Sequence, residues 1–313
     1  MVKIKVLKIW RKIRQSALNT IKMAMIALSP KAFNLLYYRL KIGRKCRLRP
    51  PVSFSEKSVW LKLNWMDPGA ALHADKIEAR AIVEKCGYAG TLIPLIGVYD
   101  SESDVDFAAL PQRFAIKAAH SSGMYIICRD KNALDPKAFR KELRSWMKCN
   151  YFYRNAEYHY KGLKARIICE ELLEDSEQTV SLRDYKIMCF NGEPRFIMVY
   201  ANRGIKSAET SCYDADWNLL PVCSGIYSRS AKAEARPAHL DFMLQIARDF
   251  SAPFPFLRVD LYEVGGKVYF GEFTFFHNAG FCKFNPVEYD DIFGSMLRLP
   301  EICTDKKITN SAE

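Results

Sequence analysis

The feature that most constrains the fold of this chain is a pair of strand-like segments near the C-terminus. The first carries Arg258 and Asp260, and the second carries Glu272 and Thr274. Gly265-Gly266 lies between them, and two adjacent glycines are typical of the tight turn in a β-hairpin. If the strands pair, both carboxylates lie at one end of a sheet, and Mg²⁺ prefers hard oxygen ligands of this kind. The pattern therefore predicts a hairpin in which Asp260 and Glu272 form a metal site.

Helical and strand patterns fill most of the chain after Pro50-Pro51, which ends an N-terminal segment. Asn191-Gly192 predicts a second hairpin, and no internal repeat interrupts the series. Strands joined by hairpins and mixed with helices indicate an α+β fold with mostly antiparallel sheets. We expect helices over residues 55–65 (capped by Ser53 or Ser55), 73–86, 135–148 and 237–250, and strands over 92–98, 113–118, 125–129, 166–172, 185–190 and 195–200.

The net charge of +12 is unevenly distributed along the 313 residues. Residues 1–49 contain 14 Lys or Arg residues and no acidic residue. Subtracting these 14 from the total of 47 leaves 33 basic residues against 35 acidic ones in the remainder. The basicity therefore belongs to an N-terminal arm. The apolar content of 49% excludes general disorder, and the length allows two or three subdomains.

The arm has the pattern of an amphipathic helix. Its longest apolar run, Met23–Leu28, is far shorter than the ~20 residues that span a bilayer, and no secretory cleavage site follows. Two interpretations stay open: a helix lying on anionic cytoplasmic lipid, and a helix packed on the body with a solvated basic face. A nucleic-acid partner is disfavoured because no basic surface with interleaved aromatic residues follows. The apolar stripe consists of Val6, Trp10, Ile13, Ala17, Ile21, Ala24 and Leu28.

Ten cysteines occur singly, with no CxxC pair, and several lie inside apolar runs. This distribution is typical of reduced cysteines in a cytoplasmic protein. Five isolated histidines show no zinc-binding spacing. We therefore expect a cytoplasmic protein, and the lipid-binding interpretation of the arm would place it on the inner face of the plasma membrane.

Further motifs accompany the hairpin in a fixed order, and together they resemble the ATP-grasp superfamily. The resemblance is closest to its TupA-like branch, from bacterial polysaccharide gene clusters, and covers residues 70–290. The motifs are Asp75-Lys76 followed by Arg80, Leu-Pro-x-x-Phe-x-Ile-Lys117, His120-Ser-Ser-Gly123, Glu170-Glu171, Asp184-Tyr-Lys186 and Arg258-Val-Asp260 with Gly271-Glu272.

The resemblance implies two α+β subdomains that grip ATP between them. We expect a basic helical arm at 1–50, a lead-in at 51–112, the first ATP-grasp subdomain at 113–172, the second with the metal site at 173–300, and a tail at 301–313. ATP-grasp ligases usually have a larger N-terminal domain that helps to bind the substrate. Substrate recognition here would depend on another region, and the 201–236 insert is one candidate.

The resemblance also assigns the nucleotide site. Lysines would neutralise phosphate oxygens, a loop from His120 would cover the phosphates with backbone N–H groups, and the backbone after Glu170 would contact adenine. For each, an ordinary surface lysine, turn or strand end is the alternative. The implied residues are Lys76, Lys117, His120, Ser121, Gly123, Glu170, Glu171, Leu173, Asp184 and Lys186.

In the implied catalytic centre, Asp260 and Glu272 would hold Mg²⁺ against the β- and γ-phosphates, and Arg258 would stabilise the transferred phosphoryl group. Arg203 would hold the substrate carboxylate or the γ-phosphate. Thr274 stands where many ATP-grasp enzymes have a metal-binding asparagine, so it is a poorer candidate ligand. The alternative for the acidic pair is an exposed hairpin without a metal.

The resemblance implies an ATP- and Mg²⁺-dependent ligase that activates a carboxylate as an acyl phosphate for attack by an amine. Its setting would be capsule, O-antigen or related polysaccharide assembly, with a sugar or glycan-linked carboxylate and an amine as partners. Asp214-Ala-Asp216 fits the Asp-x-Asp pattern of metal-dependent glycosyltransferases, which gives one alternative. An ATP-dependent phosphotransferase and a catalytically silent membrane scaffold are the others.

Overall fold

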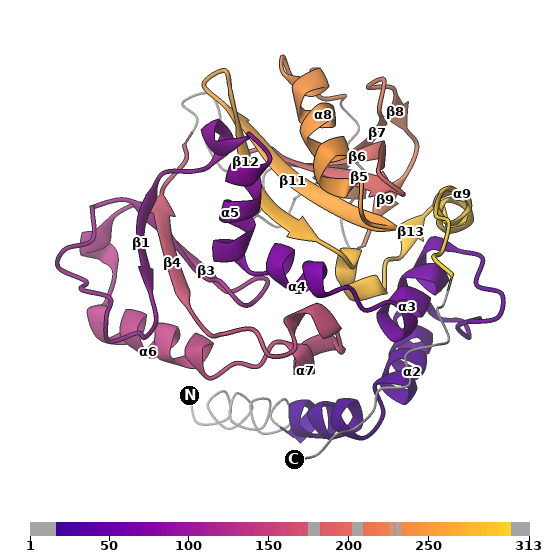
Figure 1. The fold of residues 1–313 in the computed structure, drawn as a ribbon, viewed down its shortest axis with the longest axis horizontal. Helices are drawn as coiled ribbons and strands as arrows, with labels where there is room; N and C mark the ends of the chain where they lie inside the picture. Colours follow the sequence, from indigo (N-terminus) through magenta and orange to yellow (C-terminus); the bar gives the residue numbers. More distant parts are fainter. Residues whose placement is uncertain (1–16, 175–181, 202–208, 226–227, 230–232, 302–313) are drawn as a thin grey trace, which may run out of the picture.

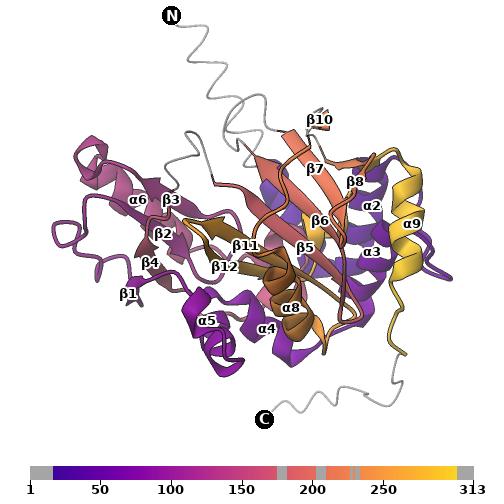
Figure 2. The same cartoon turned by 90° about the horizontal axis from the view of Figure 1, so that it is seen from above.

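The computed structural model describes residues 17–174, 182–201, 209–225, 228–229 and 233–301. Two β-sheets lie on either side of a pair of helices, α4 (Pro68–Ala74) and α5 (Lys76–Lys85) (Figure 1). The helices near the two ends of the described chain lie beyond the second sheet (Figure 2). The architecture is the expected mixture of helices and mostly antiparallel sheets.

The first sheet contains four antiparallel strands in the order β1-β4-β2-β3. Helix α6 (Pro136–Met147) covers one face, where its Phe139, Leu143 and Trp146 are buried against Phe114 and Ile116 of the sheet. Asp135 caps this helix by accepting from two backbone N–H groups, as the Asp-Pro pair indicates. The strands are β1 (Leu95–Tyr99), β2 (Phe114–Ala118), β3 (Tyr125–Cys128) and β4 (Ile167–Glu171).

The second sheet has seven strands, in the order β10-β7-β6-β5-β11-β12 with β8 paired to β7. The β10–β7 pair is parallel and the others are antiparallel. A small sheet of β9 (Cys223–Ser224) and β13 (Phe284–Asn285) lies beside it. The strands of the seven-stranded sheet are β5 (Asp184–Phe190), β6 (Glu193–Ala201), β7 (Glu209–Asp214), β8 (Leu219–Leu220), β10 (Ser228–Arg229), β11 (Phe256–Val264) and β12 (Lys267–Thr274).

Helix α8 (Leu240–Ser251) packs on one face of the second sheet (Figure 2). Cys189 on β5 contacts the Ala247 carbonyl of this helix, and Leu257 on β11 lies beside Cys189 in the sheet register. Side chains alternate between the two faces of a strand, so Arg258 and Asp260 lie on the opposite face. That face is turned toward the first sheet, and the apolar face toward α8 forms the core.

The remaining helices cover the end of the second sheet. Ser53 and Glu56 form a reciprocal capping box at the start of α3, so Ser53 is the cap of the first expected helix. These helices are α2 (Pro30–Ile42), α3 (Phe54–Asn64) and α9 (Glu288–Met296) (Figure 2). The chain also contains the short helix α7 (Phe152–Asn155) and the 3₁₀ turns η1 (Ala89–Thr91), η2 (Lys131–Ala133), η3 (Tyr158–Tyr160) and η4 (His277–Gly280).

One predicted helix is confirmed from residue 76 onward but starts too early. The expected helix over 73–86 is two helices, α4 and α5, which are separated at Asp75. Asp75 has an extended backbone, and its Oδ1 accepts from the N–H groups of Ile77 and Glu78. A short side chain that accepts from the following N–H groups starts a helix and does not continue one. The other predicted helices and strands are confirmed, with ends that differ by a few residues.

Residues 17–28 form a helix that precedes α2. It packs on the body through Ile26, which is fully buried beside Phe152 of α7 and Phe281. No helix in the described ranges is both long and apolar enough to span a bilayer. The part of the predicted stripe before residue 17 lies outside the described residues.

Candidate functional site between the two sheets

Lys76, the first residue of α5, joins the two sheets. Its backbone N–H donates to the carbonyl of Ala119 at 3.1 Å, and its ammonium contacts the Ser121 carbonyl; both belong to the loop after β2. The same ammonium lies 3.8 Å from Glu272 Oε2 on the second sheet. Burial lowers the pKa of Lys76, while the nearby Glu272 opposes the shift. The break at Asp75 thus aims a buried lysine into the space between the sheets.

Glu170 of β4 binds two cations on the first sheet. Its Oε2 lies 2.6 Å from Lys117 Nζ, and its Oε1 lies 2.8 Å from Arg80 of α5. Ala115 pairs with Glu170 in the register, so Lys117, two residues further along β2, is on the same face. Glu170 is therefore a buried side-chain anchor, whereas the predicted adenine contact relies on the backbone after it.

On the second sheet, register places the predicted residues in one row. Lys186 of β5 lies opposite Asp260 of β11, and Asp260 lies opposite Glu272 of β12. The register shifts between Asp260 and Leu261, so Gly271 is the extra residue of a β-bulge; an added Cβ there would lie 3.0 Å from the Asp260 carbonyl oxygen. The predicted approach of the two carboxylates is confirmed by this pairing. Asp184 shares the face, two residues before Lys186.

The row is a buried ion-pair network. Arg258 donates to Asp260 Oδ1 and Oδ2 at 2.6 and 2.7 Å and reaches Glu272 Oε1 at 3.2 Å. Lys186 lies 2.8 Å from Asp184 and also contacts Asp260. Burial alone would raise the pKa of Asp260, but Arg258 and Lys186 outweigh it and lower that pKa. For Arg258, burial acts to lower the pKa, and Asp260 and Glu272 reverse the shift. Both groups are therefore held in their charged forms.

His277 completes this network and was not predicted. Its Nδ1 accepts from Arg258 at 3.1 Å, because a guanidinium has no acceptor, so Nε2 carries the proton toward Ser224 Oγ at 3.2 Å. Burial, followed by the charges of Arg258 and Lys186, lowers the pKa of His277 well below its usual value. An isolated histidine after a strand carries no sequence signal for this role. Arg80 does carry a sequence signal, because it follows Lys76 by four residues and therefore lies on the same face of the helix.

Only part of the predicted phosphate loop is free to contact a ligand. His120 is buried, where its Nδ1 accepts from the Arg166 N–H and its Nε2 lies 3.2 Å from the Trp146 carbonyl. Its side chain therefore anchors the loop to α6, while the predicted phosphate contact depends on the backbone N–H groups of the loop. The buried Ser121 hydroxyl has no hydrogen-bond partner in the described part of the chain, and Gly123 has a φ of +74° with open space at its Cβ position. These two positions remain suited to an anionic ligand.

Other predicted residues are placed differently. Glu171 is exposed and Leu173 is half-buried, so only Glu170 of the doublet points inward. Arg203 lies outside the described residues. Asp214 accepts from the N–H groups of Asp216 and Asn218 and from the Asn218 side chain, so it holds its own turn. This turn explains the Asp-x-Asp pattern without a ligand.

The donor set at the hairpin fits Mg²⁺ only together with a nucleotide. Among the described residues, no three His, Cys, Asp or Glu side chains gather at one point. Asp260 and Glu272 supply two hard oxygen groups, and phosphate oxygens and water would have to supply the rest. Thr274 ends β12 opposite Arg258 and is half-buried, while Asn278 directs its amide nitrogen toward Ser224 and Cys282. Glu272 is the more accessible ligand, with a side-chain exposure of 29%.

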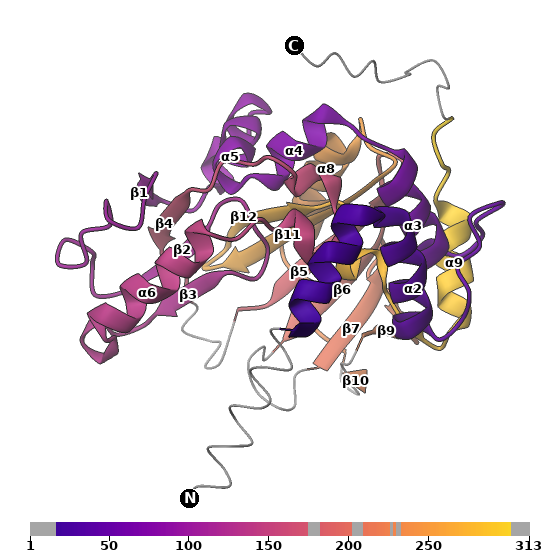
Figure 3. The same cartoon turned by 90° about the horizontal axis from the view of Figure 1, so that it is seen from below.

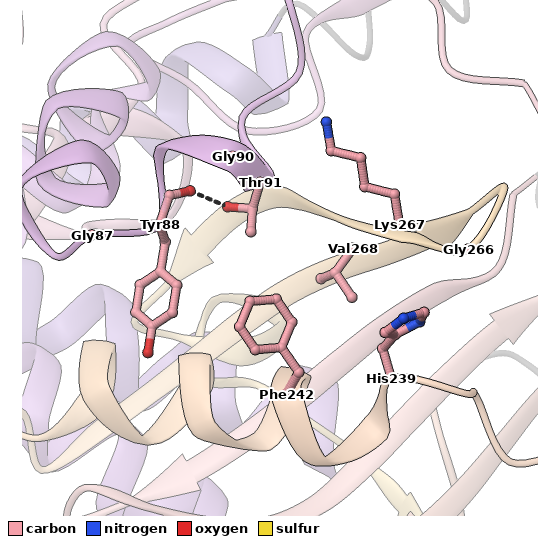
Figure 4. A pocket seen from close by; sticks show the side chains of 9 residues that line it. All are labelled: Gly87, Tyr88, Gly90, Thr91, His239, Phe242, Gly266, Lys267 and Val268. Carbon is pink, nitrogen blue, oxygen red and sulfur yellow. Dashed lines mark hydrogen bonds between the residues drawn. The ribbon is translucent and has the colours of Figure 1, made fainter.

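Two cavities lie near these elements. One of about 10 Å³ lies between α4, α5, η3 and β12, and its lining includes Lys76, Glu272 and Tyr160. The other, of about 330 Å³, lies at the tip of the hairpin between Tyr88, Phe242 and Lys267 (Figure 4). None of the predicted site residues lines the larger cavity, so we place the candidate site at the smaller one.

Comparison with solved structures gives ATP-grasp ligases, all at low identity. D-alanine–D-alanine ligase from Bacillus anthracis complexed with ATP is 14% identical, with a TM-score of 0.40 over 70% of this chain and 56% of that one. Phosphoribosylamine–glycine ligase from Thermotoga maritima is 14% identical, with a TM-score of 0.39 over 66% and 48%. D-cycloserine synthetase is 13% identical, with a TM-score of 0.38 over 72% and 71%. This chain spans about half the length of the first two.

No curated protein matches the chain. The family model described as TupA-like ATPgrasp matches residues 56–298, which include every described residue of the network between the sheets. This range covers most of the chain and confirms the resemblance drawn from the ordered motifs. The protein belongs to the TupA-like ATP-grasp family and has the ATP-grasp fold of that family.

Proposed function

We propose that this protein is an ATP- and Mg²⁺-dependent ligase that activates a carboxylate as an acyl phosphate and joins it to an amine. The observation that carries the proposal is the convergence of Lys76, Lys117 and Arg258 on one narrow space. Lys117 comes from the first sheet, Arg258 from the second and Lys76 from α5, and they meet Glu170 and Glu272. A polyphosphate is the kind of ligand that such convergent, partly buried cations neutralise.

The side chains divide the work as follows. Lys76, Lys117 and Lys186 hold phosphate oxygens, and Asp260 and Glu272 hold Mg²⁺, which when bound neutralises the β- and γ-phosphates. Arg258 stays protonated and stabilises the negative charge that grows on the transferred phosphoryl group. Ser121 and Gly123 lie beside Lys76 and bind phosphate through the loop backbone.

The reaction has two balanced steps. A carboxylate oxygen attacks the γ-phosphorus, the bond to the bridging oxygen breaks, and ADP leaves with an acyl phosphate as the other product. The amine nitrogen then attacks the acyl carbon, inorganic phosphate leaves, and the amine proton passes to water. Exclusion of bulk water by the two sheets protects the acyl phosphate from hydrolysis.

Nucleotide choice tests the first half of the proposal. Calorimetry with Mg²⁺ should detect ATP but neither UDP-glucose nor UDP-glucuronate, because the site is built around a triphosphate. Asp214→Asn is the matched control, since Asp214 holds only its own turn. Tight UDP-sugar binding that Asp214→Asn abolishes would favour the glycosyltransferase alternative and contradict the proposal.

Hydroxylamine tests the second half, because it converts an acyl phosphate into a stable hydroxamate. With ATP and a panel of uronic acids and amino acids, we expect ADP and hydroxamate in equal amounts from at least one probe. ADP formed with a phosphate ester and without hydroxamate would instead identify a phosphotransferase. ATP that binds without turnover under any probe would support the silent-scaffold alternative.

The setting we propose is the assembly of capsule, O-antigen or a related bacterial surface polysaccharide, with a sugar or glycan-linked carboxylate as acceptor. The TupA-like family membership supports this setting. We also propose a cytoplasmic location, which is supported by the use of ATP and by nine described cysteines that are all free thiols. Arg203 and the 201–236 insert are proposed to contact the carboxylate.

A further inference from the structure

The helix of residues 17–28 packs on the body through one narrow face. Ile26 is fully buried in a cluster with Phe33, Phe152 and Phe281, and Met25 is partly buried against the same cluster. Lys22 reaches Asn155 of α7 at 3.4 Å. Figure 1 shows the helix at the lower edge of the molecule with α7 above it. The attachment fixes which side of the helix faces outward.

The predicted apolar stripe lies on that outward side. With 3.6 residues per turn, Ala17, Ile21, Ala24 and Leu28 lie within one narrow sector, directly opposite Ile26. Ile21 is 60% exposed and Leu28 is 87% exposed, and both alanines are exposed as well. Within residues 17–28, the helix packs on the body as one interpretation expects, but the side turned away from the body is apolar.

Helix α2 also exposes apolar side chains. Leu36 and Leu40 follow each other by one turn and are 43% and 69% exposed. Figure 1 shows α2 following directly after the helix of residues 17–28 and turning away from it at an angle, and Figure 3 shows both helices from below. Exposed leucine and isoleucine side chains gathered on neighbouring helices are unusual on a solvated surface and mark a contact site.

The charge around this surface is of one sign. Residues 17–49 contain eight Lys or Arg residues and no acidic residue. Arg44 and Arg47 are paired with Asp290 and Glu56 of the body. Lys31, Arg39 and Lys41 of α2 are exposed. The occupant of the surface must therefore accept apolar side chains and carry negative charge.

We infer that the surface formed by the helix of residues 17–28 and α2 docks on an anionic lipid bilayer. Leu28, Ile21 and Leu40 enter the acyl boundary, and the exposed lysines contact acidic headgroups. A second copy of the chain fits less well, because a two-fold contact would place the same basic, acid-free segments against each other. The inference is independent of the ligase proposal, since no residue of the nucleotide site takes part.

Co-sedimentation with vesicles tests the inference. The full chain should bind vesicles of phosphatidylcholine with phosphatidylglycerol, bind pure phosphatidylcholine much more weakly, and dissociate as NaCl rises toward about 1 M. Ile21→Glu and Leu28→Glu should each lower the partition coefficient about tenfold or more, because each removes a buried aliphatic side chain from the lipid. Val287→Glu and Ile292→Glu are matched controls, since both residues are exposed aliphatics on or next to α9.

The outcomes separate the occupants. Loss of vesicle binding in the Ile21 and Leu28 variants only, with ATP affinity unchanged, supports the inference. Equal binding by wild type and both variants overturns it. A lipid-free dimer in analytical ultracentrifugation that Leu28→Glu converts to a monomer would also overturn it, because the stripe would then be an interface between copies.

Discussion

Arg258 and Asp260 form a two-pronged ion pair within one strand. The guanidinium donates to both carboxylate oxygens at 2.6 and 2.7 Å, and its third nitrogen donates a hydrogen bond to His277. Residues two apart on a strand face the same side, so this pair is local and does not depend on the approach of the two sheets. It keeps the Asp260 carboxylate ionised before any metal arrives.

We expect Arg258→Lys to reduce kcat by about a hundredfold while changing ATP affinity little. Lysine keeps the charge but loses the planar fork that contacts Asp260 and Glu272 together. Steady-state ADP release with the best carboxylate probe gives kcat, and calorimetry gives the affinity. Full activity in Arg258→Lys would show that the fork is dispensable.

Lys117→Met should weaken ATP binding by about 10- to 100-fold with little loss of stability. Glu170 stays paired with Arg80 at 2.8 Å, so no buried carboxylate is left alone, while one phosphate contact of about 1.5–3 kcal/mol disappears. Lys137→Met on exposed α6 is the control and should bind ATP like wild type. Identical affinities for the two variants would remove Lys117 from the nucleotide site.

Gly271→Ala should destabilise the protein by about 1–3 kcal/mol, because the new Cβ would lie 3.0 Å from both the Asp260 carbonyl oxygen and the Tyr262 ring. Urea denaturation measures the free energy of unfolding. Gly90→Ala is the control, since its Cβ would meet nothing within 4 Å. If both substitutions lower the free energy of unfolding by the same amount, the bulge does not depend on glycine.

The burial of Lys62 leads us to expect that the stability of the protein depends on pH. It is buried, donates to the carbonyls of Asn155 and Ala279 at 2.6 and 3.0 Å, and burial lowers its pKa to about 7, which Glu157 opposes and Lys22 reinforces. Above pH 7 the unfolded chain, with a lysine pKa near 10.5, binds a proton that the folded chain does not. Stability from this group therefore rises with pH between those values and is constant below them.

The measurement isolates the lysine from its acidic neighbour. Free energies of unfolding for Glu157→Gln and for Glu157→Gln with Lys62→Met should be compared at about pH 7 and about pH 9. The variant that keeps Lys62 should gain about 2–3 kcal/mol relative to the other over this interval. A difference that stays constant, or that reverses in sign, would contradict the lowered pKa.

Much of the second sheet could be predicted from the sequence, because its signals are local. The glycine pair sets the hairpin turn, and period-two alternation places Asp260 and Glu272 on one face. The bulge at Gly271 was not predicted, since a glycine within a strand pattern does not specify which partner residue it displaces. The order of lysine motifs gave the fold through family resemblance, and not through any one pattern.

The rest depended on tertiary contacts. Asp75 looks helical within an amphipathic stretch, yet its side chain caps α5 and is bound by Arg166 at 3.1 Å from another segment. His120 and His277 are isolated in sequence, so only packing decided that one anchors a loop and the other holds Arg258. For the arm, periodicity identified the apolar stripe correctly but not which face the body would cover.

The central claim is that the hairpin carboxylates hold the metal of a bound nucleotide. Calorimetric titration of ATP into wild type, Asp260→Asn and Glu272→Gln, each with and without Mg²⁺, tests it most directly. We predict that Mg²⁺ tightens ATP binding to wild type by tenfold or more, about 1.4 kcal/mol, and that this gain disappears in both variants. An equal Mg²⁺-dependent gain in all three proteins would contradict the account.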